Sequence, residues 1–109
     1  MTPDPKPPAR VKDKKARPTG DRCVATGVNY DLHAHHLISR GQDGDDVADN
    51  LVWVAGYLHD HFHHGSVTQR YEAGHAIRKG LGLEHIDYIV DHRRGGWAWL
   101  ESKYPADPW

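Results

Sequence analysis

The 109-residue sequence has few of the residues that stabilise a small protein covalently or anchor it in a membrane. It holds a single cysteine, Cys23, which excludes an internal disulfide and favours a reducing compartment such as the cytoplasm. No apolar run approaches the roughly 18 residues of a membrane helix, and no apolar signal-peptide core is visible near the start. A chain this short forms at most one domain with a modest core, so a bound metal would be a useful source of stability.

Net charge is also small, at −1, but the two signs are separated along the chain. Residues 1–22 carry seven Lys and Arg against three Asp, a balance of +4, whereas residues 23–109 carry seven basic and twelve acidic residues, a balance of −5. Residues 1–20 contain five prolines and almost nothing to bury, which predicts a disordered basic arm. Such an arm could bind a polyanion or serve only as a solubilising tail.

Histidine, in contrast, is abundant, and seven of the ten histidines fall between residues 32 and 65. They form two clusters, HAHH and HDHFHH, which are separated by an acidic, glycine-containing loop and by Asn50. This distribution raises the question of what the imidazoles bind. A lone cysteine cannot make a structural zinc site, so the histidines need another explanation.

The two clusters fall on a predicted strand, loop, strand and helix. Residues 32–38 form a strand-like run, residues 50–54 (NLVWV) are β-branched and aromatic as in a second short strand, and residues 55–64 predict a helix. Between the strands, the aspartates of QDGDDVAD lack the terminal glutamate of an EF-hand. They are therefore expected to form a solvated turn and not a calcium site.

The last third of the chain, residues 66–109, is expected to be helical. Ser66 or Thr68 could cap the first of its helices, and the glycines of KGLG and RRGG mark breaks between helices. The tryptophans are expected to pack in the small core and not to stack on bases; they are Trp97, Trp99 and Trp109.

The spacing of the histidines favours a metal site. His59 and His63 are four residues apart, which on a helix places both imidazoles on one face, with Cβ atoms about 5–6 Å apart. Such a pair alone is more typical of a solvated helix surface. Neighbouring strand residues such as His35 and His36 point to opposite sides, so one can bind a metal while the other acts as a base. Metal-assisted hydrolysis requires this division of roles.

Taken together, HHLI with a following basic residue, Asn-Leu-Val and His-x3-His resemble the HNH endonuclease family. The intervals of 14 residues from His36 to Asn50 and nine from Asn50 to His59 are usual for that family. The resemblance covers about residues 20–65 and implies a ββα-metal finger. The expected fold is therefore α+β, divided into a basic arm (1–20), an HNH nuclease core (21–65) and a helical C-terminal extension that packs on the core (66–109).

The resemblance also implies a role for each site residue. His36 matches the general base, and Asn50 matches the residue that braces the loop and holds that base in orientation. His35, His59 and His63 match the ligands of one divalent ion, which would bind the scissile phosphate and stabilise the leaving 3′ oxygen. The products would carry 5′-phosphate and 3′-hydroxyl ends. Imidazole ligands favour Zn, Ni, Co or Mn over Mg on affinity, and the identity of the metal stays open.

One departure from the family concerns a second metal. Many relatives carry two CxxC pairs that bind a structural zinc outside the active site. The four positions would be Cys23, Thr26, Ala55 and Leu58, so three of the four ligands are missing. No structural zinc is therefore expected, and apolar packing would take its place.

DNA is the expected partner, and Arg40 and Arg70 are candidates for phosphate contacts. No base-reading pattern can be assigned, so little sequence specificity is expected. Small HNH proteins are frequent in bacteriophages, which makes a phage terminase a further possible partner and the host cytoplasm the expected location. The alternatives are a ribonuclease, which the sequence does not distinguish from a DNase, and a non-catalytic metal- or DNA-binding module, which would have no need of His36.

Overall fold

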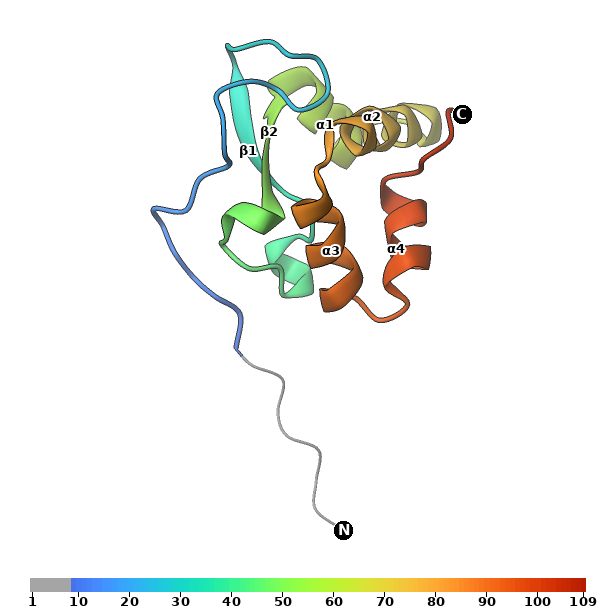
Figure 1. Cartoon of the computed structure of the whole chain (residues 1–109). Helices are drawn as coiled ribbons and strands as arrows, with labels where there is room; N and C mark the ends of the chain where they lie inside the picture. The colour runs from blue at the N-terminus through green and yellow to red at the C-terminus, as the bar shows by residue number, and fades with distance from the viewer. Residues whose placement is uncertain (1–8) are drawn as a thin grey trace.

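The structure, a computed structural model, describes residues 9–109 and contains a two-stranded antiparallel sheet and four α-helices (Figure 1). The expected α+β class and the order strand, loop, strand, helix are confirmed. None of the helices in residues 9–109 combines the length and the apolarity needed to cross a membrane. The elements in chain order are β1 (Leu32–His36), the 3-10 turns η1 (Arg40–Gln42) and η2 (Ala48–Asn50), β2 (Leu51–Ala55), α1 (Gly56–His64), α2 (Val67–Gly80), α3 (Leu83–His92) and α4 (Gly96–Lys103).

The hairpin of β1 and β2 carries the first histidine cluster. Its register places His36 opposite Leu51. Because strand side chains alternate between faces, His33 and His35 point to the side opposite His36. β2 is buried along nearly its whole length, as its β-branched and aromatic sequence LVWVA favours.

The buried side chain of Asn50 closes the loop between the strands. Its Oδ1 accepts a hydrogen bond from the Ile38 backbone N–H at 2.8 Å, and its Nδ2 donates to the carbonyls of Ile38 and Asp45, both at 3.0 Å. A Cβ at Gly44 would lie 1.7 Å from the Ile38 carbonyl oxygen, so this close approach requires glycine. Asp46 is only 6% exposed in this closed loop. The prediction of a solvated turn is therefore wrong for Asp46.

The helices pack on the hairpin through one core. α2 begins with a capping box, in which Ser66 Oγ accepts from the Gln69 N–H at 3.1 Å and Gln69 Oε1 accepts from the Ser66 N–H at 2.9 Å. Ser66, and not Thr68, is thus the cap. Core residues come from the hairpin, from all four helices and from the segment after α4; they are Leu37, Ile38, Val52, Val54, Leu58, Ala73, Ile77, Tyr88, Ile89, Leu100 and Tyr104.

The expectation that all three tryptophans pack in the core is wrong for two of them. Trp99 packs against the core, but Trp97 and Trp109 are 57% and 65% exposed. Residues two apart on a helix point about 200° apart, so Trp97 and Trp99 cannot both face the core. Trp109 instead contacts the ring of Tyr71, with centroids 4.9 Å apart.

The prediction of a disordered arm does not hold for residues 10–13, which contact the folded body. Residues 1–8 of that arm lie outside the described residues. From residue 10 onward the chain runs along the β1–β2 loop and makes specific contacts with it. Backbone N–H groups at residues 11 and 13 donate to the carboxylates of Asp45 and Asp46. Arg10 forms an ion pair with Asp46. Composition gave no sign of these contacts, because their partners are acidic residues more than 30 positions away.

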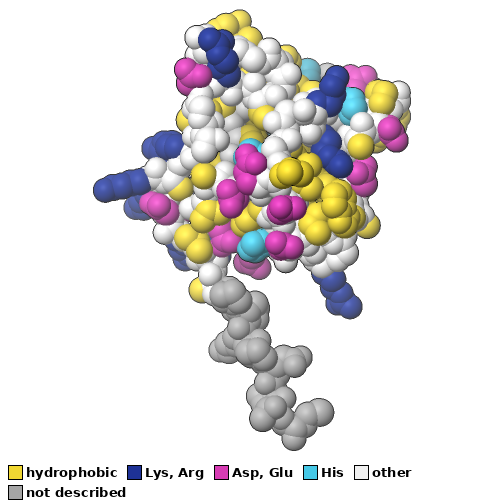
Figure 2. All heavy atoms as spheres, viewed as in Figure 1, with side chains coloured by type: hydrophobic (Ala, Val, Ile, Leu, Met, Phe, Trp, Pro, Cys, Tyr) yellow, Lys and Arg dark blue, Asp and Glu magenta, His cyan; other side chains and the backbone are white. Residues whose placement is uncertain are grey.

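One face of the molecule is rich in acidic side chains. Figure 2 shows acidic side chains gathered over α3, with Lys and Arg side chains at the margins of that view. A polyanion would be repelled by this face, so a nucleic acid would have to bind elsewhere on the molecule.

We predict that Asn50→Ala lowers the free energy of unfolding by about 3 kcal/mol, because it leaves the buried backbone groups of Ile38 without partners. Asn29 is exposed, so Asn29→Ala is a matched control that should change stability by less than about 0.5 kcal/mol. Urea denaturation of both variants measures the difference. Equal stability of the two variants would contradict the bracing role of Asn50.

Candidate metal centre

β1 and α1 bring three imidazoles together. His35, His59 and His63 each offer one ring nitrogen, and these three atoms lie within 4.8 Å of one another. The Nε2 atoms of His59 and His63 are 3.1 Å apart. Two nitrogens that bind one ion at 2.0–2.1 Å in tetrahedral geometry are separated by about 3.3 Å, so the observed spacing suits a shared metal. The three ligands predicted from the sequence therefore meet at one point.

The orientation of His35 is fixed by Tyr104, which follows α4. The Tyr104 hydroxyl donates its only proton to the Leu37 carbonyl at 2.7 Å. It can therefore only accept from His35 Nε2, which lies 2.8 Å away. His35 thus carries its proton on Nε2, and its Nδ1 keeps a lone pair.

The buried Nδ1 atom of His35 is suited to bind a metal ion. The residue is only 1% exposed, and its Nδ1 has no hydrogen-bond partner within residues 9–109. A buried polar atom without a partner costs free energy, and such atoms are rare in folded proteins. A divalent ion shared with His59 and His63 would accept this lone pair. Metal-binding histidines commonly donate a hydrogen bond through the ring nitrogen that does not bind the metal, as His35 does to Tyr104.

The surroundings also keep these imidazoles neutral, as metal ligands must be. Burial lowers the pKa of His35 well below 6.5, with a further contribution from the charges of His59 and His63. Burial, followed by the neighbouring His63, lowers the pKa of His59 to about 4. Burial likewise lowers the pKa of His63. Lone pairs on all three rings are therefore available at neutral pH.

His33, to which the sequence gave no firm role, lies beside the cluster. Its Nδ1 is 3.2 Å from His59 Nδ1, and the two rings meet edge to face. This contact occupies the His59 nitrogen that faces away from His63. His33 therefore helps to orient His59, and the alternation of β1 could have indicated this, because His33 and His35 share a face.

His36 points to the other side of β1, as predicted, but its partner was not foreseen. Its Nε2 lies 2.9 Å from Asp46 Oδ1. The resemblance implied that Asn50 holds the His36 ring in orientation. Asn50 instead contacts the backbone of the two residues after His36. Its backbone carbonyl accepts a hydrogen bond from the Leu37 N–H at 2.9 Å, and its side chain bonds to Ile38. Asn50 braces the loop, and Asp46 contacts the imidazole.

Two surface hollows, of about 420 and 500 Å³, meet at this centre. Both are lined by His36 and His63, and each has the size of a pocket for a small organic group. Arg40 lines the larger hollow and Arg70 the smaller one. The two arginines predicted to contact phosphates thus line different hollows, both of which include His36 and His63.

Further cationic and aromatic residues line the hollows, and the sequence singled out none of them individually for a site role, although it suggested polyanion binding for the basic arm as a whole. Lys14 and Arg17 of the N-terminal segment line the larger hollow. Lys103 and Trp99 line the smaller one. Lysine and arginine are common on any surface, so only the fold could show which of them face the histidines.

The residues at the positions where HNH family members hold a structural zinc make weak hydrogen bonds and apolar contacts. The buried Cys23 thiol accepts from the N–H groups of Thr26 at 3.4 Å and Ala55 at 3.3 Å. Ala55 and Leu58 are buried beside the core.

Comparison with protein-family models finds no match, and comparisons with curated proteins and with solved structures find no significant match either. The function of the site therefore has to be argued from its geometry.

We predict that Tyr104→Phe weakens Co²⁺ binding about tenfold, because His35 loses the acceptor that fixes its Nε2 proton. The same change removes the donor to Leu37 and should cost about 1 kcal/mol of stability. Titration followed by visible absorption measures the affinity. Tyr30→Phe, at an exposed tyrosine, should leave it unchanged. Equal affinities in the two variants would contradict the tautomer assigned to His35.

A second prediction concerns the metal-free protein in acid. The folded pKa of His59 is about 4 and its ordinary value is 6.5, so between these limits the unfolded chain binds more protons than the folded one. The free energy of unfolding should therefore fall as the pH drops from about 6.5 towards about 4, and the contribution of His59 should level off below that. Urea denaturation at several pH values tests this. His59→Gln should flatten the dependence more than His64→Gln, and equal slopes would contradict it.

Proposed function

We propose that this protein is a metal-dependent endonuclease of the HNH type, which hydrolyses phosphodiester bonds in DNA with little sequence specificity. The observation that carries the proposal is the three-histidine cluster, in which the buried Nδ1 of His35 has no hydrogen-bond partner within residues 9–109. His36, on the opposite face of the same strand, lines the hollows that contain His63. This arrangement separates metal ligands from a base.

The chemistry divides among the chain's own residues. His35, His59 and His63 would hold one divalent ion, which when bound supplies positive charge that stabilises the phosphate in the transition state and the leaving oxygen. His36 accepts a proton from the attacking water through an unprotonated ring nitrogen. The water oxygen forms a bond to phosphorus, the bond from phosphorus to the 3′ oxygen breaks, and that oxygen takes a proton from solvent. The products are 5′-phosphate and 3′-hydroxyl ends.

The residues around the histidines support a nucleic-acid strand as the substrate. The larger hollow contains Lys14, Arg17 and Arg40, so its cations can contact phosphates on one side of the centre. In the smaller hollow, Arg70 is accompanied by aromatic rings on which a base could stack. A strand that crosses the histidines would meet cations in both hollows.

The kinds of contact available to a strand also account for the low sequence specificity we propose. Lysine and arginine side chains recognise phosphates, and aromatic rings stack on any base, so neither kind of contact carries sequence information. The metal would add to affinity at the scissile phosphate. Overall binding should weaken with added salt, as expected when cations replace counterions on DNA.

The proposal is tested by incubating the full-length protein with supercoiled plasmid and Mg²⁺, Mn²⁺, Ni²⁺, Zn²⁺ or EDTA. We predict nicking that depends on the metal and is reduced by His36→Ala by about 10²- to 10⁴-fold, the usual contribution of a general base. Co²⁺ affinity should survive in His36→Ala and be lost in His63→Ala.

His64→Ala provides the control, because it removes an exposed imidazole from the same cluster and should retain activity. Cleavage of RNA but not of plasmid would replace the DNA substrate with RNA. A folded protein that binds one metal and cleaves neither nucleic acid with any ion would contradict a nuclease and favour a binding module.

A further inference from the structure

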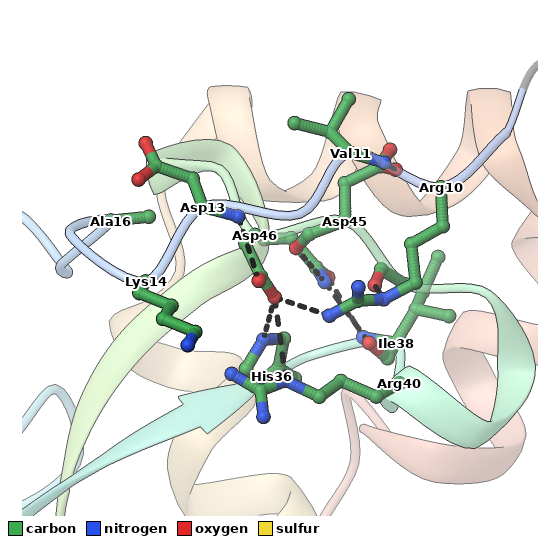
Figure 3. A network of polar contacts seen from close by, with 12 residues as sticks. Arg10, Val11, Asp13, Lys14, Ala16, His36, Ile38, Arg40, Asp45 and Asp46 are labelled. Carbon is green, nitrogen blue, oxygen red and sulfur yellow. Dashed lines mark hydrogen bonds and ion pairs between the residues drawn. The ribbon is translucent and has the colours of Figure 1, made fainter.

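The most highly connected side chain near the candidate site is one that the nuclease reaction as described does not use. Asp46 is buried in the β1–β2 loop and lies at the centre of a polar network (Figure 3). Its Oδ1 accepts from His36 Nε2 at 2.9 Å and from Arg10 Nη2. Its Oδ2 accepts from the Asp13 backbone N–H at 3.0 Å. Arg40 Nε lies 3.4 Å from Oδ1.

We propose that Asp46 is the positioning residue of the nuclease centre and that Arg10, from the N-terminal segment, holds Asp46 in place. The proposal rests on the nuclease function proposed above and adds a residue to it. It also makes Arg10 and the backbone N–H groups of Val11 and Asp13 part of the structure that positions the base, and not a tail beside it.

The direction of the hydrogen bond between Asp46 and His36 follows from the state of the carboxyl group. The Asp13 N–H, the His36 ring and the positive charge of Arg10 hold the pKa of Asp46 well below 3.8. An ionised carboxylate only accepts hydrogen bonds, so His36 must donate through Nε2. The neutral ring then carries its lone pair on Nδ1, and this is the atom that can take the proton from water.

The arginines hold the carboxylate beside the ring. Arg10 and Arg40 both contact the Asp46 carboxylate and so compensate its charge. From this position Asp46 can orient the ring, in the way that the aspartate of a catalytic triad selects a tautomer.

The N-terminal segment is built to hold this carboxylate. The Arg10 side chain is 13% exposed, and its Nε donates to the Gly44 carbonyl at 2.7 Å while its Nη2 reaches Asp46. The Val11 N–H donates to Asp45 Oδ1 at 2.7 Å. Three consecutive loop residues are therefore bound by the segment, and the last of them contacts the base.

The experiment compares variants matched in charge, using the full-length protein. Asp46→Asn and Asp49→Asn each remove one charge from the same loop, but Asp49 is exposed. Arg10→Ala and Lys12→Ala each remove one charge from the N-terminal segment, and Lys12 is exposed. The kcat and KM for plasmid nicking are measured for all four variants. The ¹⁵N shifts of the neutral His36 ring, which distinguish the Nε2–H from the Nδ1–H tautomer, are measured without metal.

The wild type should show the Nε2–H tautomer of His36. Asp46→Asn and Arg10→Ala should lower kcat by about 10- to 100-fold, as loss of an orienting partner does at other sites, with KM and Co²⁺ affinity within about twofold of the wild type. Both should also raise the fraction of the Nδ1–H tautomer. Asp49→Asn and Lys12→Ala should match the wild type in every measurement.

The results distinguish a failure of the positioning role of Asp46 from a failure of the proposed nuclease function. An active wild type whose kcat and His36 tautomer are unchanged by Asp46→Asn and by Arg10→Ala would overturn the positioning role and leave the nuclease intact. An inactive wild type would overturn the nuclease, and the tautomer measurement would still decide whether Asp46 controls the His36 ring. If Asp46→Asn does not fold, Arg10→Ala carries the decision, because it leaves the carboxylate in the loop.

Discussion

The buried amide of Asn50 is the interaction on which the rest of the site depends. Its three hydrogen bonds tie the end of β1 to the middle of the following loop, so a segment rich in aspartate and glycine is held in one shape from the inside. Leaving buried backbone groups unpaired would cost more than the hydrogen bonds themselves contribute, so the closed loop is strongly preferred. As a consequence, Asp46 lies beside His36 and its carboxylate is available to the N-terminal segment.

The C-terminal helices also contribute to the candidate metal centre. Tyr104 is fully buried in the core and stacks on Phe62 of α1, with the two rings 5.2 Å apart and nearly parallel. Its hydroxyl joins His35 to the Leu37 carbonyl. The packing of the segment after α4 therefore determines which nitrogen of His35 carries its proton. A change that loosens the core would also release the imidazole.

Electrostatics divides the molecule in a way that its net charge of −1 conceals. Acidic side chains gather over α3, whereas the hollows at the histidines contain cations from the N-terminal segment, the loop and the helices. Asp13 and Asp46 are the acidic residues that line the larger hollow, and Arg10 and Arg40 compensate the charge of Asp46. A divalent ion on three neutral imidazoles would keep its full charge, so the local field would be positive even though the body of the protein is acidic.

The sequence alone determined the order of strands and first helix and the three histidines of the candidate metal centre, because the spacing His-x3-His on a helix and the alternation in a strand are local geometry. Two exposed tryptophans, the buried Asp46 and the contacts of residues 10–13 could not be predicted from it. Only the tertiary structure decided that Tyr104 orients His35 and that Asp46 contacts His36. The first of these pairs joins residues 69 positions apart. The contact of Asp46 with His36 depends on the closure of the β1–β2 loop by Asn50. Neither a contact between residues far apart in the chain nor the closed shape of a loop leaves a pattern in the sequence.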